Sequence, residues 1–335
     1  MVRRYLLLLA LVLGAAGVSA AKAGDPVQNL LLPLDCKPGV DCWAVRYVDH
    51  DPGPGERDHA CGRQTGDGHK GTDFAIRDLA AIAAGVEVRA AAAGVVDALR
   101  DGMADVSVED TGREAVGGKE CGNGVRLDHG DGWTTWYCHL RRGSIVVKEG
   151  DPVAAGQMLG LVGLSGDTSF PHVHFDVRRG DEVVDPFVGL GRAGGCGAGP
   201  APLWSAQVAA QLAYRPVTLT NAGIAPDVPE IEDVRRGYRT EALPVTAPTL
   251  VMWAEAYWIE AGDRVTFRLL GPDLTPVVER GLTIDQGRRR WFGYAGERRP
   301  GERWPAGDYH GTLTVERASG GLPERFAIEH TVTLR

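Results

Sequence analysis

Short apolar segments separated by glycine-containing turns recur along most of the chain. Before residue 189 they are GVEVRAAAAGVVDAL, NGVRLDHG, WTTWYCHL, SIVVKEGDPV, GQMLGLVG and HVHFDVRR. After residue 202 they are ALPVTAPTLVMWAEAYWI, DRVTFRLLGPD, RRRWFGYAG, AGDYHGTLTVER and ERFAIEHTVTL. Apolar runs of this length between turn residues are typical of β-strands. We therefore expect a mainly β protein.

Two segments have patterns that differ from this rhythm. The alanine-rich run from Ala80 to Ala93 has helical composition, but Gly85 and two valines interrupt it, so we expect a strand or loop there. The segment LWSAQVAAQLA, residues 203–213, has the length and composition of a short helix.

A linker rich in glycine and proline, GLGRAGGCGAGPAP at residues 189–202, divides the chain. Seven of the nine histidines precede it. We expect an N-terminal wrap over residues 24–60, a first domain over 61–188 and an accessory β-sandwich over 203–335. The cluster Arg288–Arg290 near the middle of this second domain is interpreted as a solvated strand edge.

The first residues have the layout of a cleaved secretory signal. Arg3 and Arg4 precede an apolar run that ends in small residues, which predicts a signal peptide over residues 1–23. The alternative is a retained N-terminal anchor. No later apolar run approaches the roughly 18 residues that cross a bilayer, and the nearest cysteine, Cys36, is too distant for a lipoprotein signal. We expect a periplasmic or secreted protein without a membrane span after signal removal.

The charge of the chain argues against nucleic acid as a partner. The full sequence has a net charge of −8, and removal of residues 1–23 takes away three basic residues and no acid, which makes it −11. An acidic surface binds nucleic acid poorly.

All six cysteines survive signal removal, and an even number in an exported chain favours disulfides. The segment GVRLDHGDGWTTWYC is predicted to form a hairpin turning at residues 129–132, and pairing Val125 with Thr134 places Cys121 opposite Cys138. Fifteen pairings exist in principle. We expect Cys36–Cys42, which closes a small loop, Cys121–Cys138, and by elimination Cys61–Cys196.

Two histidines lie two residues apart in PHVHFDVR at residues 171–178. Because alternate side chains of a strand face the same side, His172 and His174 are predicted to share one face. His69 and Asp73, in GHKGTDFA, add an imidazole and a carboxylate from a segment whose glycines disfavour a helix. One histidine of the pair and a water molecule would complete an open, catalytic zinc site. The sequence therefore predicts hydrolysis.

A further histidine, His139, directly follows Cys138 in WYCHL. Alternation along a strand would place it on the face opposite the disulfide, pointing toward a cleft. There it can stabilise an oxyanion or transfer a proton. The alternative is a histidine that packs beside the disulfide.

Three motifs together, GHKGTDFA, GNGVRLDHGDGWTTWYCHL and VKEGDPVAAGQMLGLVGLSGDTSFPHVHFDVR, closely resemble the M23 (lysostaphin-like, LytM-type) zinc metallopeptidases and occur in that family's order. The resemblance extends from about Cys61 to Pro186. It implies a mainly antiparallel β core with an open groove for an extended peptide. It also implies His69, Asp73 and His174 as ligands of Zn²⁺ and His139 and His172 as the catalytic pair. Phe170, where the family usually has a small residue, and an enlarged loop over residues 101–120 depart from the pattern.

The function implied is that of an exported zinc metallo-endopeptidase that hydrolyses peptide cross-links of bacterial peptidoglycan by attack of a zinc-activated water. Its binding partners would then be peptidoglycan stem peptides or cross-links. The alternatives are a secreted protease that cuts glycine-rich protein sites and a non-catalytic M23-like activator of a cell-wall amidase. The activator is expected to lack metal ligands, which this sequence retains. The second domain is a wall-binding module, a surface for a partner protein, or a lid over the groove.

Overall fold

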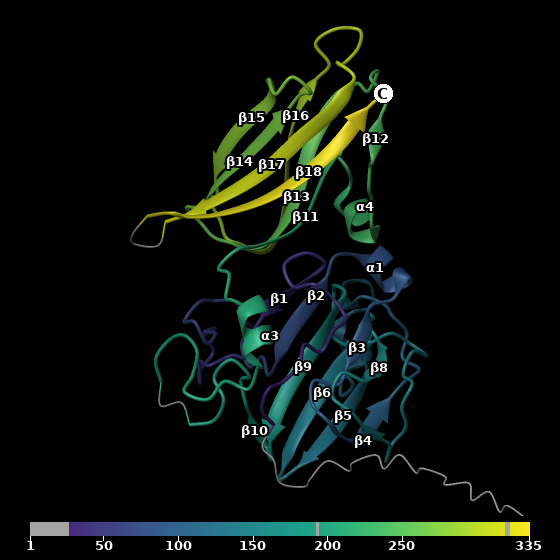
Figure 1. The fold of residues 1–335 in the computed structure, drawn as a ribbon, viewed down its shortest axis with the longest axis vertical. Coiled ribbons are helices and arrows are strands. Elements are labelled where there is room, and N and C mark those ends of the chain that lie inside the picture. Colours follow the sequence, from purple (N-terminus) through teal and green to yellow (C-terminus); the bar gives the residue numbers. More distant parts are fainter. Residues whose placement is uncertain (1–26, 192–193, 319–321) are drawn as a thin grey trace, which may run out of the picture.

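The computed structural model describes residues 27–191, 194–318 and 322–335. The predicted signal peptide, residues 1–23, lies outside the described residues. Two β-rich regions follow one another along the chain, and Figure 1 shows the C-terminal strands above the sheet formed by the first half. The domain boundaries given above remain predictions.

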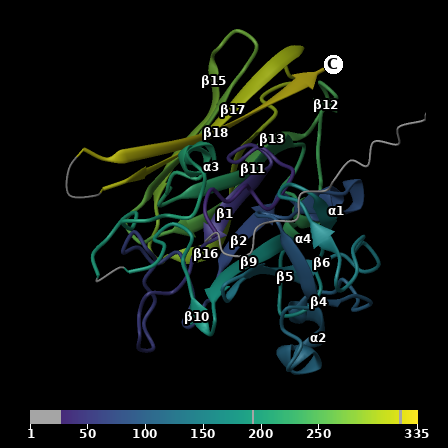
Figure 2. The same cartoon turned by 60° about the horizontal axis from the view of Figure 1, so that its bottom comes forward.

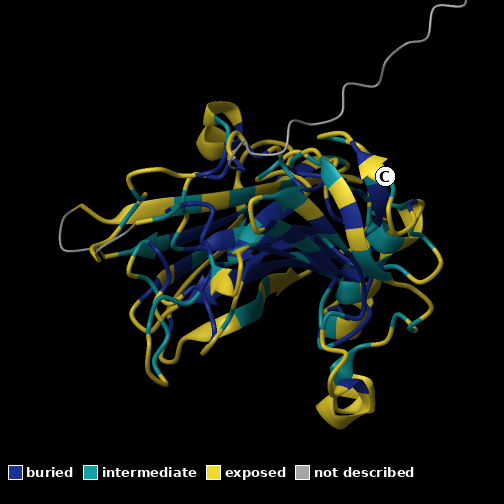
Figure 3. Cartoon of the chain, turned by 90° about the horizontal axis from the view of Figure 1, so that it is seen from below, coloured by how far each residue is buried: buried dark blue, intermediate teal, exposed yellow. Residues whose placement is uncertain are grey.

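The first region contains an eight-stranded antiparallel sheet among the described residues. Its main order is β1-β2-β9-β6-β5-β4-β7, and β10 pairs with β9. The strands are β1 (Cys42–Arg46), β2 (Thr72–Ile76), β4 (Gly94–Arg100), β5 (Asn123–Gly130), β6 (Trp133–Leu140), β7 (Pro152–Val153), β9 (His172–Arg179) and β10 (Glu182–Val183). The histidine-bearing β9 therefore lies between β2 and β6, in the interior of the sheet. Figure 3 shows the buried residues concentrated along the strands.

A smaller pair of strands and several short helices complete the first region. Strand β3 (Glu87–Arg89) pairs with β8 (Met158–Leu161). The helices are α1 (Leu79–Ala84), α2 (Val108–Thr111), the 3₁₀ turn η1 (Arg113–Val116) and α3 (Ala206–Gln211). The predicted helix within residues 203–213 is present as α3. Helix α2 and η1 lie in the loop over residues 101–120, and Figure 2 shows α2 at the far end of the first region.

The expectation of a strand or loop over the alanine-rich run is wrong for its first part. Helix α1 forms there because the Asp78 side chain accepts a hydrogen bond from the Ala81 amide, which caps the helix N-terminus. Gly85 then ends the helix with φ 89°, a conformation that favours glycine. The strand β3 follows directly after this glycine.

The predicted register of the hairpin is also wrong. Val125 pairs with Tyr137, not with Thr134, which pairs with Asp128. Gly130 pairs with Trp133, so the hairpin turns at residues 131–132, and a register shift between Asp128 and Gly130 moves the partner of Val125 by one residue.

The C-terminal region is a sandwich of two sheets. Strands β11 (Thr218–Ala225), β13 (Thr249–Ile259) and β16 (Arg288–Arg298) form one, and β12 (Ala242–Leu243), β14 (Arg264–Leu270), β15 (Pro276–Thr283), β17 (Gly307–Arg317) and β18 (Glu324–Leu334) form the other. Apolar side chains from both sheets, such as Met252 and Phe267, pack together between them. Helix α4 (Ile231–Arg236) connects β11 to β12. The prediction of a mainly β, antiparallel fold followed by a second β-sandwich is confirmed.

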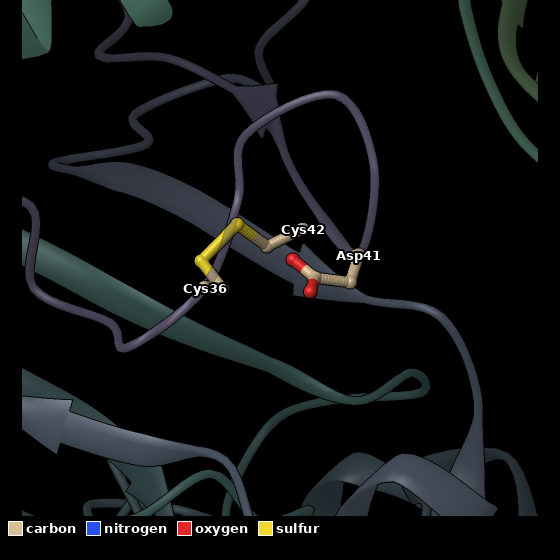
Figure 4. A group of neighbouring side chains, drawn as sticks. All are labelled: Cys36, Asp41 and Cys42. Atoms are coloured by element: carbon tan, nitrogen blue, oxygen red, sulfur yellow. A yellow bond between two sulfur atoms is a disulfide. The ribbon is translucent and has the colours of Figure 1, made fainter.

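The six cysteines form the disulfides Cys36–Cys42, Cys61–Cys196 and Cys121–Cys138, the pairs expected from the sequence. Figure 4 shows the first of these with the Asp41 carboxylate beside it. Because an oxidised cysteine pair offers no thiolate, this group is not a metal site. No helix in the described ranges is long and apolar enough to cross a membrane.

Candidate active site

The register between β2 and β9 brings a carboxylate and two imidazoles to one face of the sheet. Asp73 on β2 is the cross-strand partner of His174, and Ala75 is the partner of His172. Paired residues share a face, as do residues two apart on one strand. His69 reaches the same place from the loop before β2, so the four side chains converge.

Three of these side chains present ligand atoms to one another. Asp73 Oδ1 lies 3.1 Å from His69 Nε2 and 2.8 Å from His174 Nδ1, and the two nitrogens are 3.2 Å apart. Tetrahedral coordination of zinc, with bonds of about 2.0–2.1 Å, separates neighbouring ligand atoms by about 3.3 Å. Two imidazoles and one carboxylate at this spacing therefore fit a zinc ion with one coordination position left open.

The backbone around His69 fixes the orientation of its ring. His69 Nδ1 donates a hydrogen bond to the Tyr47 carbonyl oxygen at 2.7 Å, which leaves the Nε2 lone pair facing Asp73 and His174. Gly71 sits against the opposite side of the site: a Cβ there would lie 2.4 Å from the Phe175 carbonyl oxygen and 2.8 Å from His174 Nε2. The second glycine of GHKGTDFA is thus required by a close approach.

Asp73 concentrates negative charge at the centre of the site and is only 1% exposed. Burial raises the pKa of Asp73, but the charges of His69 and His172 and the hydrogen bonds from His174 and His69 outweigh burial and hold that pKa well below its usual value. Burial lowers the pKa of His69, and the charge of Asp73 outweighs this and raises it. The negative charge of Asp73 therefore favours the binding of a cation between Asp73 and the neighbouring imidazoles.

The remaining two histidines lie side by side next to this group. The ring centroids of His139 and His172 are 4.6 Å apart, and His172 Nε2 lies 3.5 Å from Asp73 Oδ1. His139 Nδ1 is 2.8 Å from the Ser165 carbonyl oxygen and His172 Nδ1 is 2.9 Å from that of Phe170. Because a carbonyl oxygen only accepts hydrogen bonds, both rings carry their hydrogen on Nδ1 and keep a lone pair on Nε2.

Both of these imidazoles are neutral near pH 7. Burial lowers the pKa of His139 well below its ordinary value, and the neighbouring imidazoles of His172 and His174 lower it further. Burial likewise lowers the pKa of His172 to about 4, against the charge of Asp73, which raises it. The two Nε2 atoms can therefore accept a proton or a hydrogen bond.

These residues belong to a segment with known relatives, since residues 67–186 match the sequence profile of Peptidase family M23. Residues 67–186 are an M23 peptidase domain. Peptidoglycan DD-endopeptidase ShyA of Vibrio cholerae is 41% identical over 63 residues, 18% of this chain and 14% of that protein. Murein hydrolase activator EnvC of Escherichia coli is 38% identical over 68 residues, 20% of this chain and 16% of that protein.

Part of the chain is also similar to a solved structure. The catalytic domain of the prophage-encoded M23 protein EnpA from Enterococcus faecalis, solved as a point mutant, has 27% identity and a TM-score of 0.30, covering 43% of this chain and 98% of that chain. The chain spans only 10–22% of the length of the first curated relatives that it matches.

The route by which His139 reaches the M23 site differs from the predicted one. Cys138 pairs with His174 and therefore lies on the metal-site face of the sheet, so simple alternation would turn His139 away. His139 instead has φ 65°, a left-handed conformation that non-glycine residues rarely adopt. This local conformation turns its side chain back toward His172. Such a conformation persists where the surroundings hold it, and here the His139 amide donates a hydrogen bond to the Cys121 carbonyl oxygen at 2.8 Å.

A cavity of about 760 Å³ opens over the M23 site. Its walls come from β1, β2, β6, β9, the loop over residues 101–120 and two C-terminal strands, and they include the predicted site residues His69, Asp73, His139, His172 and His174. Its C-terminal lining residues are Tyr257, Trp258, Arg289 and Arg290.

Several residues around the M23 site escaped the sequence prediction. The backbone carbonyl groups of Tyr47 and Ser165 accept hydrogen bonds from His69 and His139, and a backbone group cannot be recognised from residue type. Arg290, predicted to belong to a solvated edge, lines the cavity instead. Strand β16 is an edge strand, but Arg289 and Arg290 near its first residue line the cavity over the site. Tyr257 and Arg290 are cross-strand partners in the C-terminal sheet. They reach the cavity only because the C-terminal sandwich packs against the first region, which a local sequence pattern does not indicate.

Proposed function

We propose that this protein is an exported zinc metallo-endopeptidase that hydrolyses peptide cross-links of bacterial peptidoglycan. The observation that carries the proposal is the convergence of His69 Nε2, Asp73 Oδ1 and His174 Nδ1 within 3.2 Å of one another, beside two neutral histidines. In this proposal His69, Asp73 and His174 hold Zn²⁺, while His139 and His172 carry out the proton transfers.

A zinc ion bound there supplies Lewis acidity, which activates water and polarises a peptide carbonyl group. Asp73 and the imidazoles of His69 and His174 would hold the ion. The hydrogen bond from His69 Nδ1 to the Tyr47 carbonyl oxygen leaves the Nε2 lone pair of His69 free to bind it. One of the neutral Nε2 atoms of His139 and His172 accepts the proton of the attacking water. The protonated or hydrogen-bonded partner then stabilises the oxyanion or gives a proton to the leaving amine.

The cavity suits an extended peptide, because it is open and lined from several strands. The substrate class is supported by relatives named as peptidoglycan endopeptidases, such as ShyA, and by the predicted signal peptide. The similarity to EnvC raises the activator alternative. All three candidate ligands are present with ligating geometry in this chain, which favours an enzyme.

Zinc content and hydrolysis test the proposal together. The purified mature protein is expected to contain about one zinc ion per chain by elemental analysis and to release muropeptides from purified sacculi. His69→Ala is expected to lose both properties. His310→Ala, which removes an exposed histidine on β17, is the matched control and is expected to keep both. A wild-type protein without bound zinc, or His69→Ala with full zinc content, would overturn the assignment of the metal site. Cleavage of glycine-rich proteins with intact sacculi would favour the secreted protease instead.

A further inference from the structure

Phe170 holds the candidate catalytic residue His172 in two ways. Its ring stacks on the His172 imidazole with centroids 4.3 Å apart and planes 16° apart. Its carbonyl oxygen accepts the hydrogen bond from His172 Nδ1 at 2.9 Å. Ring position and tautomer of His172 therefore both depend on where Phe170 lies. The Thr168 hydroxyl lies beside this contact, 3.1 Å from the same Nδ1, and donates a hydrogen bond to the Phe170 carbonyl oxygen.

The C-terminal sandwich in turn holds Phe170 from the other side. The ring of Tyr257 on β13 lies 5.7 Å from the Phe170 ring. The guanidinium of Arg290 on β16 lies 5.7 Å above Phe170 and 5.7 Å above Tyr257, at cation–π distance from both. Glu255 fixes this guanidinium through an ion pair of 3.6 Å.

Direct contacts join the sandwich to the first region, at strand β1 and beside Phe170. Trp258 donates a hydrogen bond from Nε1 to the Val45 carbonyl oxygen on β1 at 2.5 Å. Tyr257 and Trp258 share a buried apolar cluster with Trp43, Val45 and Ala75, and Phe170 packs against it. The positive φ of Trp258, 64°, allows these two consecutive residues to face the same neighbour.

Two ion pairs reinforce the contact on either side of this cluster. Arg289 pairs with Glu56 at the rim of the cavity. Arg239 pairs with Asp78, the capping residue of α1, at 2.7 Å. Because Asp78 is buried, loss of its partner would be costly.

We propose that the C-terminal sandwich is a built-in part of the active site, in which Arg290 and Tyr257 act as positioning residues for His172 through Phe170. This inference rests on the proposed peptidase function. It distinguishes the second domain from a tethered binding module, because a tethered module would not set the position of a catalytic side chain. It also explains the presence of a large aromatic residue at position 170, since a small side chain there would lose the ring contacts with His172, Tyr257 and Arg290.

Loss of positioning is expected to slow the chemical step more than it weakens substrate binding. Displacement of a catalytic group by about 1 Å costs as much as 100-fold in rate. We expect Phe170→Leu to lower kcat by about 10- to 100-fold and to change KM by less than about 3-fold. Arg290→Gln removes the cation–π contacts and is expected to lower kcat by about 3- to 10-fold. Arg290→Lys retains a cation and is expected to recover most of this loss.

The test measures kcat, KM and zinc content of the full-length mature protein, with a purified cross-linked muropeptide as substrate. Arg288→Gln is the matched control, because Arg288 lies on the same strand, is exposed and does not line the cavity. The control is expected to behave as wild type. Zinc content is expected to be unchanged in every variant, because none of the substituted residues contacts a ligand atom of the metal site.

An active wild-type protein whose Phe170→Leu and Arg290→Gln variants keep the wild-type kcat would overturn this inference and leave the proposed function standing. A change in KM alone would also overturn it, because it would show a substrate contact in place of positioning. If Phe170→Leu fails to fold, the comparison of Arg290→Gln with Arg290→Lys decides. A zinc-loaded wild-type protein that cleaves no peptide bond would overturn the proposed function, and this inference with it.

Discussion

Trp258 of the C-terminal sandwich packs against strand β1 of the first region, and its truncation tests how strongly the two regions are coupled. It is 7% exposed and packs with Trp43 and Val45. Truncation of a buried tryptophan to alanine costs about 3–5 kcal/mol. The buried Val45 carbonyl oxygen also loses its donor, which costs about 1–3 kcal/mol. We therefore expect Trp258→Ala to lower the free energy of unfolding by about 4–8 kcal/mol.

Urea unfolding followed by far-ultraviolet circular dichroism measures this change, at a fixed zinc concentration so that metal binding contributes equally. Trp258→Phe retains most of the apolar volume but not the donor and is expected to cost about 1–3 kcal/mol. Val146→Ala, at a position that is 61% exposed, is the control and is expected to stay within about 0.5 kcal/mol of wild type. A Trp258→Ala protein within about 1 kcal/mol of wild type would refute the coupling.

Three further predictions concern the metal site and the Cys121–Cys138 disulfide. His174→Ala is expected to lose stoichiometric zinc, whereas His172→Ala is expected to keep zinc and lose about 100- to 10,000-fold in kcat; the reverse pattern in elemental analysis would contradict the assignment. Chelation of the metal is expected to lower the melting temperature, and zinc at 100 times its dissociation constant is expected to restore about 2.7 kcal/mol; a melting curve insensitive to zinc would argue against a folded metal site. Replacement of Cys121 and Cys138 together by serine opens a short loop, since the two cysteines have a sequence separation of 17, and is expected to cost about 3 kcal/mol in urea unfolding; a loss below about 1 kcal/mol would show that the bridge is dispensable.

The part of the site that lies on regular strands could be predicted from the sequence. The two-residue period of a strand places His172 and His174 on one face whatever the rest of the fold does. The glycines around His69 and Asp73 disfavour a helix there, which favoured a loop that enters a strand. The mainly β fold and the second sandwich followed from the length and spacing of apolar segments in the same way.

Features that depend on an unusual local backbone conformation, or on contacts between residues far apart in the sequence, could not be predicted. The positive φ of His139 breaks the alternation on which its predicted orientation relied, although the residue still reaches the site. The side chain of Asp78 caps a helix at the start of the alanine-rich run, and Gly85 and the two valines that favour a strand lie after the end of that helix. The contact between Arg290 and Phe170 joins positions 120 residues apart, and no short-range pattern reports such a pairing.

Mass spectrometry of the muropeptides released from purified sacculi by the zinc-loaded mature protein tests the central claim most directly. The account predicts that cross-linked muropeptides are converted to uncross-linked ones with a free amine and a free carboxyl group at the cut peptide bond, and that a chelator or His172→Ala abolishes the conversion. An unchanged muropeptide profile from a protein that carries one zinc ion per chain would contradict it.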